Sequence, residues 1–122
     1  MFRGSSQAKI DDKGRLKIPS HFLRRLEEGY GTELFITSVQ GDRALLYPLP
    51  VWEEIESRLL EMPSTDRIRD RYLERVNYFG QQVDLDSQGR TTLPQILREA
   101  ADIQGEVVVA GRLDHLVVWN HE

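Results

Sequence analysis

The 122-residue chain contains no cysteine. This absence excludes a disulfide framework and a cysteine-based zinc site, and it is typical of intracellular proteins. No stretch approaches the roughly 18 consecutive apolar residues that a membrane-spanning helix requires. The first residues lack the apolar core of a secretory signal. Composition therefore predicts one soluble cytoplasmic domain over residues 1–122, large enough to bury a core of its own.

Positive charge is scarce overall but concentrated in one region. Sixteen Lys and Arg residues face twenty Asp and Glu residues, giving a net charge of −4. This balance by itself disfavours a nucleic-acid partner. Residues 1–25, however, hold seven basic and two acidic residues, a net charge of +5, which leaves −9 for the remainder. Such asymmetry indicates a localised anionic partner, with chance clustering of surface charges as the alternative.

Catalytic and cofactor signatures are also lacking. The three histidines, His21, His115 and His121, are scattered without the spacing of metal ligands and are interpreted as surface or interface residues. No Ser-His-Asp set is legible, and no glycine-rich phosphate loop of the Walker or Rossmann type occurs. We therefore expect no enzyme, no cofactor and no metal site.

One pattern occurs twice, 75 positions apart. Residues 11–19 and 86–94 both read Asp-x-x-Gly-Arg-x-x-aliphatic-Pro; we call them the first and second motif. A fixed offset indicates a duplicated structural unit. Asp-x-x-Gly predicts a turn, because Asp accepts hydrogen bonds from the backbone just ahead and Gly adopts positive φ. Alternating polar and apolar residues predict a strand on each side, and the proline can open a short helix.

The duplication divides the chain. We predict a first repeat over residues 5–47 and a second over residues 81–122. Residues 50–79 are predicted to be a helical insertion, with helices over 51–62 and 64–79 and with Ser64 capping the second helix. Arginines recur along this second helix at Arg67, Arg71 and Arg75. We interpret them as solvated charges, with a phosphate-contacting ridge as the alternative.

The two motifs differ in charge, and this difference locates a candidate binding site. The first motif carries Lys13, Arg15 and Lys17, whereas the second keeps only Arg90 at the equivalent positions. Lysine and arginine bind phosphate, and arginine can also fork onto a guanine edge. We therefore expect the first motif to provide the main contacts with a nucleic acid. Secondary contacts are predicted at Arg3, Lys9 and Arg90.

The remaining motif residues have a structural interpretation. Asp11 and Gly14, like Asp86 and Gly89, are assigned to holding the turns. The alternative is a paired-aspartate enzyme, since two neighbouring carboxylates can share a proton. An arginine four residues after each aspartate disfavours this alternative, because a nearby positive charge keeps a carboxylate ionised.

Three features together resemble the bacterial MraZ family over almost the whole chain. They are the opening Met1-Phe2-Arg3-Gly4, the paired motifs, and the segment Leu46-Tyr47-Pro48-Leu49-Pro50-Val51-Trp52. Each half also resembles the swapped-hairpin unit of AbrB-type regulators. The resemblance implies an α+β, mainly β fold: a duplicated swapped-hairpin, double-psi-like barrel with a helical insertion between its halves.

The resemblance also implies a function. Members of this family are sequence-specific DNA-binding transcriptional regulators of the division and cell-wall gene cluster, and they bind double-stranded repeats upstream of their own gene. They form ring-shaped homo-oligomers in the cytoplasm and nucleoid, without membrane or small-molecule partners. The family's motif arginine maps onto Arg15 and Arg90. Family members usually continue beyond the equivalent of Trp119 into a further helix and tail, whereas this chain ends three residues later. The alternative function is a non-enzymatic interaction module whose basic turn binds an acidic protein.

Overall fold

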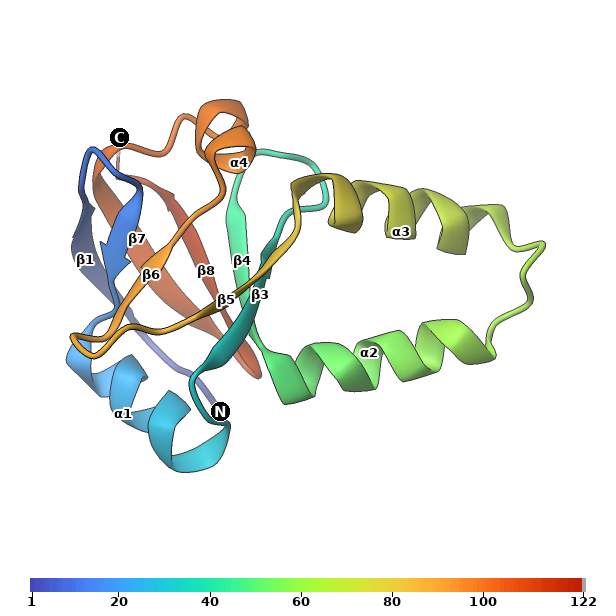
Figure 1. Ribbon diagram of the computed structural model, residues 1–122, viewed down its shortest axis with the longest axis horizontal. Coiled ribbons are helices and arrows are strands. Elements are labelled where there is room, and N and C mark those ends of the chain that lie inside the picture. Colours follow the sequence, from blue (N-terminus) through green and yellow to red (C-terminus); the bar gives the residue numbers. More distant parts are fainter. Residues whose placement is uncertain (122) are drawn as a thin grey trace.

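A computed structural model describes residues 1–121 and shows a β barrel from which a long helical hairpin projects (Figure 1). The described residues form eight strands and four helices, so the expected α+β, mainly β class is confirmed. Their bounds are β1 Ser5–Ile10, β2 Arg15–Lys17, α1 Ser20–Gly29, β3 Glu33–Thr37, β4 Ala44–Pro48, α2 Leu49–Glu61, α3 Arg67–Phe79, β5 Gln81–Asp84, β6 Arg90–Thr92, α4 Gln95–Ala100, β7 Gly105–Arg112 and β8 His115–Asn120.

All strands belong to one antiparallel sheet in the order β5-β3-β4-β8-β7-β1-β2-β6. The two edge strands, β5 and β6, are consecutive in the chain and are joined by the turn of the second motif. The edges of the sheet therefore come together, and the sheet forms a nearly closed barrel. Closure of this kind protects strand edges from pairing with other chains.

The two motifs are paired with each other through β2 and β6. The facing pairs are Arg15–Thr92, Leu16–Thr91 and Lys17–Arg90. Two equivalent hydrogen bonds flank them: the Ile18 N–H donates to the Gly89 carbonyl at 3.1 Å, and the Leu93 N–H donates to the Gly14 carbonyl at 2.9 Å. The motifs are thus related by an approximate twofold axis between β2 and β6.

The sequence pattern predicted a local hairpin around the first turn, and this prediction is only partly right. β1 meets β2 at a single pair, Ile10–Leu16, and pairs along its whole length with β7 instead. The local alternation correctly placed Leu16 inside the barrel, where it is fully buried. It carried no information about which distant strand would complete the sheet.

The barrel interior is filled by aliphatic side chains from alternate strand positions. The largest fully buried ones on strands are Leu16, Leu34, Ile36, Leu46, Val107 and Leu116. α1 lies at one end of the barrel and α4 at the other (Figure 1). Phe22 and Leu26 of α1 and Leu97 of α4 join the same core. Because the helices that follow the two motifs cover opposite ends, they hold the β2–β6 pair between them.

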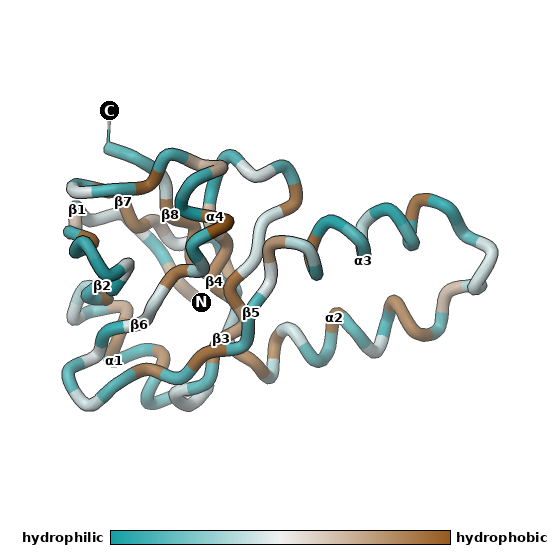
Figure 2. The backbone as a smooth tube through the Cα atoms, turned by 45° about the horizontal axis from the view of Figure 1, so that its top comes forward, coloured by the Kyte–Doolittle hydropathy of each residue, from teal (hydrophilic) through white to brown (hydrophobic). Residues whose placement is uncertain are grey.

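α2 and α3 form the projecting hairpin, and only its base is anchored to the barrel. The Trp52 ring stacks on Phe35 with 4.7 Å between ring centroids, and it lies 5.1 Å from Tyr47. The Thr37 hydroxyl donates to the Val76 carbonyl at 2.6 Å. Apolar positions nevertheless recur along both helices to their far ends (Figure 2). Those outer positions lie beyond the part of the hairpin that packs on the barrel.

The predicted bounds of these two helices need correction. α2 begins at Leu49 rather than at residue 51, because Pro50 fits the first helical turn, where its missing N–H costs nothing. α3 begins at Arg67, and its N-terminal cap is Asp66 rather than Ser64. The Asp66 carboxylate accepts the N–H groups of Ile68 and Arg69, both at 3.0 Å.

Candidate nucleic-acid interface

In the first motif, Asp11 fixes both the turn and the arginine. One carboxylate oxygen, Oδ1, accepts the backbone N–H groups of Lys13 at 3.0 Å and Arg15 at 2.9 Å. The other oxygen accepts the Arg15 Nε–H at 2.7 Å. Gly14 has φ +82°, and a Cβ there would come within 2.5 Å of the Arg98 guanidinium. The turn therefore requires glycine, and the aspartate orients the arginine through Nε alone.

The second motif repeats this geometry. Asp86 accepts the N–H groups of Gln88 and Arg90 on Oδ1, both at 2.9 Å, and the Arg90 Nε–H on Oδ2 at 2.9 Å. Gly89 has φ +73°, and a Cβ there would lie 2.4 Å from a methyl group of Leu23 on α1. Each motif glycine thus packs against the helix that follows the other motif, which ties the two turns into one unit.

These contacts keep both aspartates ionised. Hydrogen bonds to each carboxylate, the largest from the arginine backbone N–H, lower the pKa of Asp11 and of Asp86 from the usual 3.8 against an opposing effect of burial. An aspartate dyad needs one carboxyl that retains its proton at a working pH. The geometry therefore favours a positioning role for both aspartates over acid–base catalysis.

We predict that both carboxyl groups titrate below 3.8 in the folded protein. A folded-state pKa below the unfolded value means that the turns contribute to stability fully above about pH 4, and that this contribution is lost as pH falls through the folded values. Carbon-13 NMR of the side-chain carboxyls, followed from pH 6 to pH 2, measures this directly on the scale of ordinary Asp titration. A midpoint at or above 3.8 for either group would contradict the assigned hydrogen bonds.

Pairing of β2 with β6 gathers positive charge on the outer face of the barrel. Lys13, Arg15, Lys17 and Arg90 make up what we call the basic strip. Lys17 lies directly opposite Arg90, and directly opposed residues of an antiparallel pair share a face. The Lys17 ammonium donates to the Gln88 carbonyl of the second turn. Two of the predicted site residues from the first motif therefore share one surface with Arg90 from the second.

Each arginine of the strip keeps part of its guanidinium available. The side chains of Arg15 and Arg90 are 36% and 29% exposed, and each is held by its aspartate through Nε. The two terminal amino groups of an arginine held in this way can donate side by side to a phosphate or to the O6 and N7 atoms of guanine. The side-by-side like charges of Lys17 and Arg90 favour an anionic ligand, because opposed like charges otherwise destabilise a strand pair.

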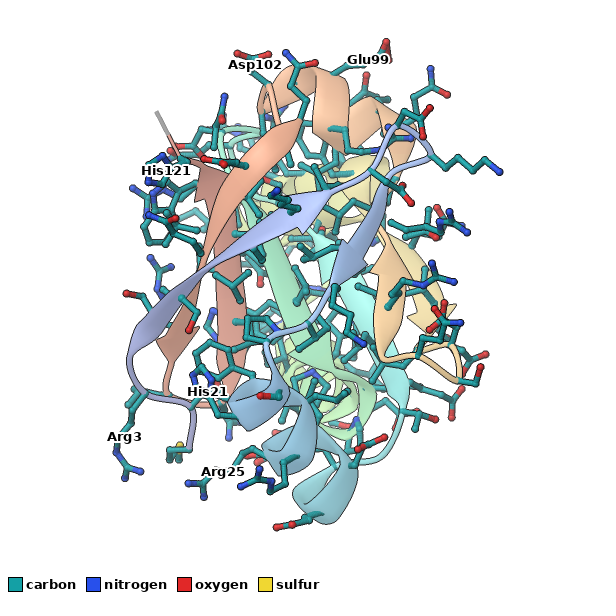
Figure 3. The ribbon with its side chains drawn as sticks, turned by 90° about the vertical axis from the view of Figure 1, so that its left-hand side faces the viewer. Arg3, His21, Arg25, Glu99, Asp102 and His121 are labelled. Atoms are coloured by element: carbon teal, nitrogen blue, oxygen red, sulfur yellow. The ribbon has the colours of Figure 1, made fainter. Side chains whose placement is uncertain are left out.

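The structure does not bring the other two predicted residues to the strip. Lys9 faces outward on β1 opposite Glu106 of β7, whose negative charge offsets it. Arg3 lies beside α1, near His21 and Arg25, at the end of the molecule away from Glu99 (Figure 3). Sequence reasoning placed Arg3 with the motif because both belong to the basic first quarter, but it did not associate Arg3 with α1.

Two structural findings bear on other functions. Within residues 1–121, no three histidine, aspartate or glutamate side chains gather as a metal site requires. Over the same residues, no helix is long and apolar enough to cross a lipid bilayer.

Comparison with known proteins agrees with the motif geometry. Residues 1–75 and 80–122 match the family described as "MraZ protein, putative antitoxin-like". The chain is 50% identical over 122 residues to "Transcriptional regulator MraZ" of Acidobacterium capsulatum, covering all of this chain and 84% of the relative. Proteins of the same name from Koribacter versatilis and Chromobacterium violaceum are 49% and 35% identical, covering all of this chain and 84% and 82% of the relatives. Family match and full-length identity together show that this chain belongs to the MraZ family of transcriptional regulators.

Proposed function

We propose that the protein regulates transcription by binding double-stranded DNA in a sequence-specific manner through the basic strip. The observation that carries this proposal is the placement of two aspartate-held arginines, Arg15 and Arg90, on one outward face. The printed name of its relatives, transcriptional regulator, supports it. In this proposal the protein is not an enzyme, and it acts in the cytoplasm at the nucleoid.

The two kinds of basic residue have different tasks. Arg15 and Arg90 recognise a base edge or clamp a phosphate, because their guanidinium groups are planar and already oriented. Lys13 and Lys17 act as mobile charges that neutralise neighbouring phosphates. Holding an arginine before DNA arrives lowers the conformational entropy lost on binding. Asp11 and Asp86 therefore contribute to affinity without touching the DNA.

We also propose how an acidic chain binds DNA tightly. A single copy offers one modest basic surface, whereas a ring-shaped homo-oligomer presents that surface several times. Linked binding sites on successive DNA repeats raise the effective concentration of each further contact. The proposed target is a set of short repeats upstream of the protein's own gene, within the division and cell-wall gene cluster. The repeats 5–47 and 81–122 within each chain, separated by the insertion 50–79, are part of this proposal.

The experiment that tests this function compares DNA fragments carrying one, two or more repeats with scrambled fragments of equal length. We expect affinity to rise steeply with the number of repeats and to fall with salt, with log K decreasing by about 0.9 per phosphate neutralised for each unit of log salt. Fluorescence anisotropy measures both quantities. Equal affinity for one repeat and for several would contradict the multivalent account. Equal affinity for scrambled DNA would favour the alternative module that binds an acidic protein.

A further inference from the structure

An apolar groove runs between α2 and α3 in the outer part of the helical hairpin. Its lining consists of Ile55, Leu59, Met62, Ile68 and Tyr72. Ile68 is 80% exposed, although it belongs to the most apolar hollow of the hairpin. The barrel anchors only the base of the hairpin, through Trp52 and Val76. These outer apolar side chains therefore have no other part of the described chain to pack against.

A polar group at this groove also lacks a partner. Arg69 lines the groove and donates one terminal N–H to the Met62 carbonyl at 3.1 Å. Its Nε is buried and has no hydrogen-bond acceptor among the described residues. A buried donor without an acceptor is destabilising, and an acceptor supplied by a partner relieves that cost. The groove thus combines exposed apolar surface with an unsatisfied cationic donor.

The two helices of the hairpin carry opposite charge. α2 has four glutamates against the single Arg58, whereas α3 has four arginines against Asp70 and Glu74. Leu60 on α2 is 79% exposed. Glu53 and Glu56 lie seven and four residues before it, which places all three on one helical face. α2 therefore presents an acidic face with an apolar centre, and α3 with the groove presents the complement.

We propose that the outer hairpin is a self-association surface, in which α2 of one copy packs on the groove and α3 of a second copy. The apolar Leu60 enters the groove, and the glutamates beside it face the arginines of α3. Every copy carries both faces, so the same contact can be repeated around a closed assembly. The proposal rests on the homo-oligomer of the proposed function but not on DNA binding.

The test reverses the charge of each face separately. One variant carries E53K and E56K on α2, and the other carries R67E and R71E on α3; all four side chains are exposed. Sedimentation velocity without DNA gives the mass of each protein and of their mixture. Wild type is expected to associate, and each variant alone is expected to associate at least about tenfold more weakly, because like charges then meet across the contact. Mixing the two variants is expected to restore the mass of the wild-type assembly, since opposite charges face each other again.

A matched apolar control separates the groove from the rest of α3. Ile68→Glu, in the groove, is expected to weaken association. Tyr78→Glu is expected to leave association unchanged, because Tyr78 is 61% exposed on α3 but lies outside the groove. A monomeric wild type, variants that keep the wild-type mass, or a folded mixture that fails to reassemble would each overturn the proposal. The last two results would assign the groove to a different protein partner. DNA binding is read in a separate assay, so its failure is distinguishable.

Discussion

Replacing Arg15 with alanine is expected to weaken binding to repeat DNA about 5- to 150-fold for each engaged subunit, which corresponds to the loss of about 1–3 kcal/mol for one arginine contact. The reason is geometric as well as electrostatic. Asp11 holds the Arg15 guanidinium through Nε at 2.7 Å and leaves its terminal amino groups available for DNA. Fluorescence anisotropy over a salt series measures the change. If Arg15 contacts a phosphate, the salt dependence should also flatten.

Two companion variants make this result specific. Arg43→Ala removes the same charge from an exposed position on the turn between β3 and β4, where Arg43 lies 4.8 Å from the Trp119 ring. We expect it to bind DNA like wild type. Arg90→Ala tests the second motif, and its loss is expected to be smaller because only one basic residue of the strip belongs to that motif. Equal losses for Arg15→Ala and Arg43→Ala would show that net charge alone matters and that the strip is not the contact surface.

Replacing Trp52 with alanine is expected to lower the free energy of unfolding by about 3–5 kcal/mol, as for other large buried aromatic residues. Trp52 is 3% exposed and stacks on Phe35, so its removal leaves a cavity where the hairpin joins the barrel. Urea unfolding at a fixed protein concentration measures the change. Fixed concentration matters because self-association also contributes to apparent stability.

The chain offers a matched control in its second tryptophan. Trp119 is only half-buried on β8, so Trp119→Ala is expected to cost clearly less than Trp52→Ala. Trp52→Phe keeps an aromatic ring at the anchor and is expected to recover part of the loss. If both alanine variants unfold at the same urea concentration, Trp52 does not anchor the hairpin.

Local chemistry explains which structural features could be predicted from sequence. Asp-x-x-Gly-Arg folds into the predicted turn because all contacts of Asp11 lie within four residues of it. Its internal repetition made the equivalent contacts of Asp86 predictable. The inward position of Leu16 followed from strand alternation. These features depend on neighbours in the sequence, and neighbours are what a single sequence records most directly.

Features that depend on distant segments were missed or misplaced. Nothing local shows that β2 pairs with β6, and therefore that Lys17 lies opposite Arg90. Arg3 was assigned to the motif surface, but its segment is held near α1 by the buried Phe2 ring, which stacks on Tyr30 at 5.6 Å. The Ser64 cap was a reasonable choice by residue type. Asp66 is the cap because its carboxylate reaches two free N–H groups of α3.

The central claim is that DNA contacts the face formed by the two motifs. Hydrogen exchange followed by mass spectrometry, with repeat DNA and with scrambled DNA of the same length, tests it most directly. We predict slower exchange on repeat DNA in the peptides that cover residues 11–18 and 86–93, and no comparable change on scrambled DNA. Protection confined to α1 or α3, with both turns exchanging as in the free protein, would contradict the account.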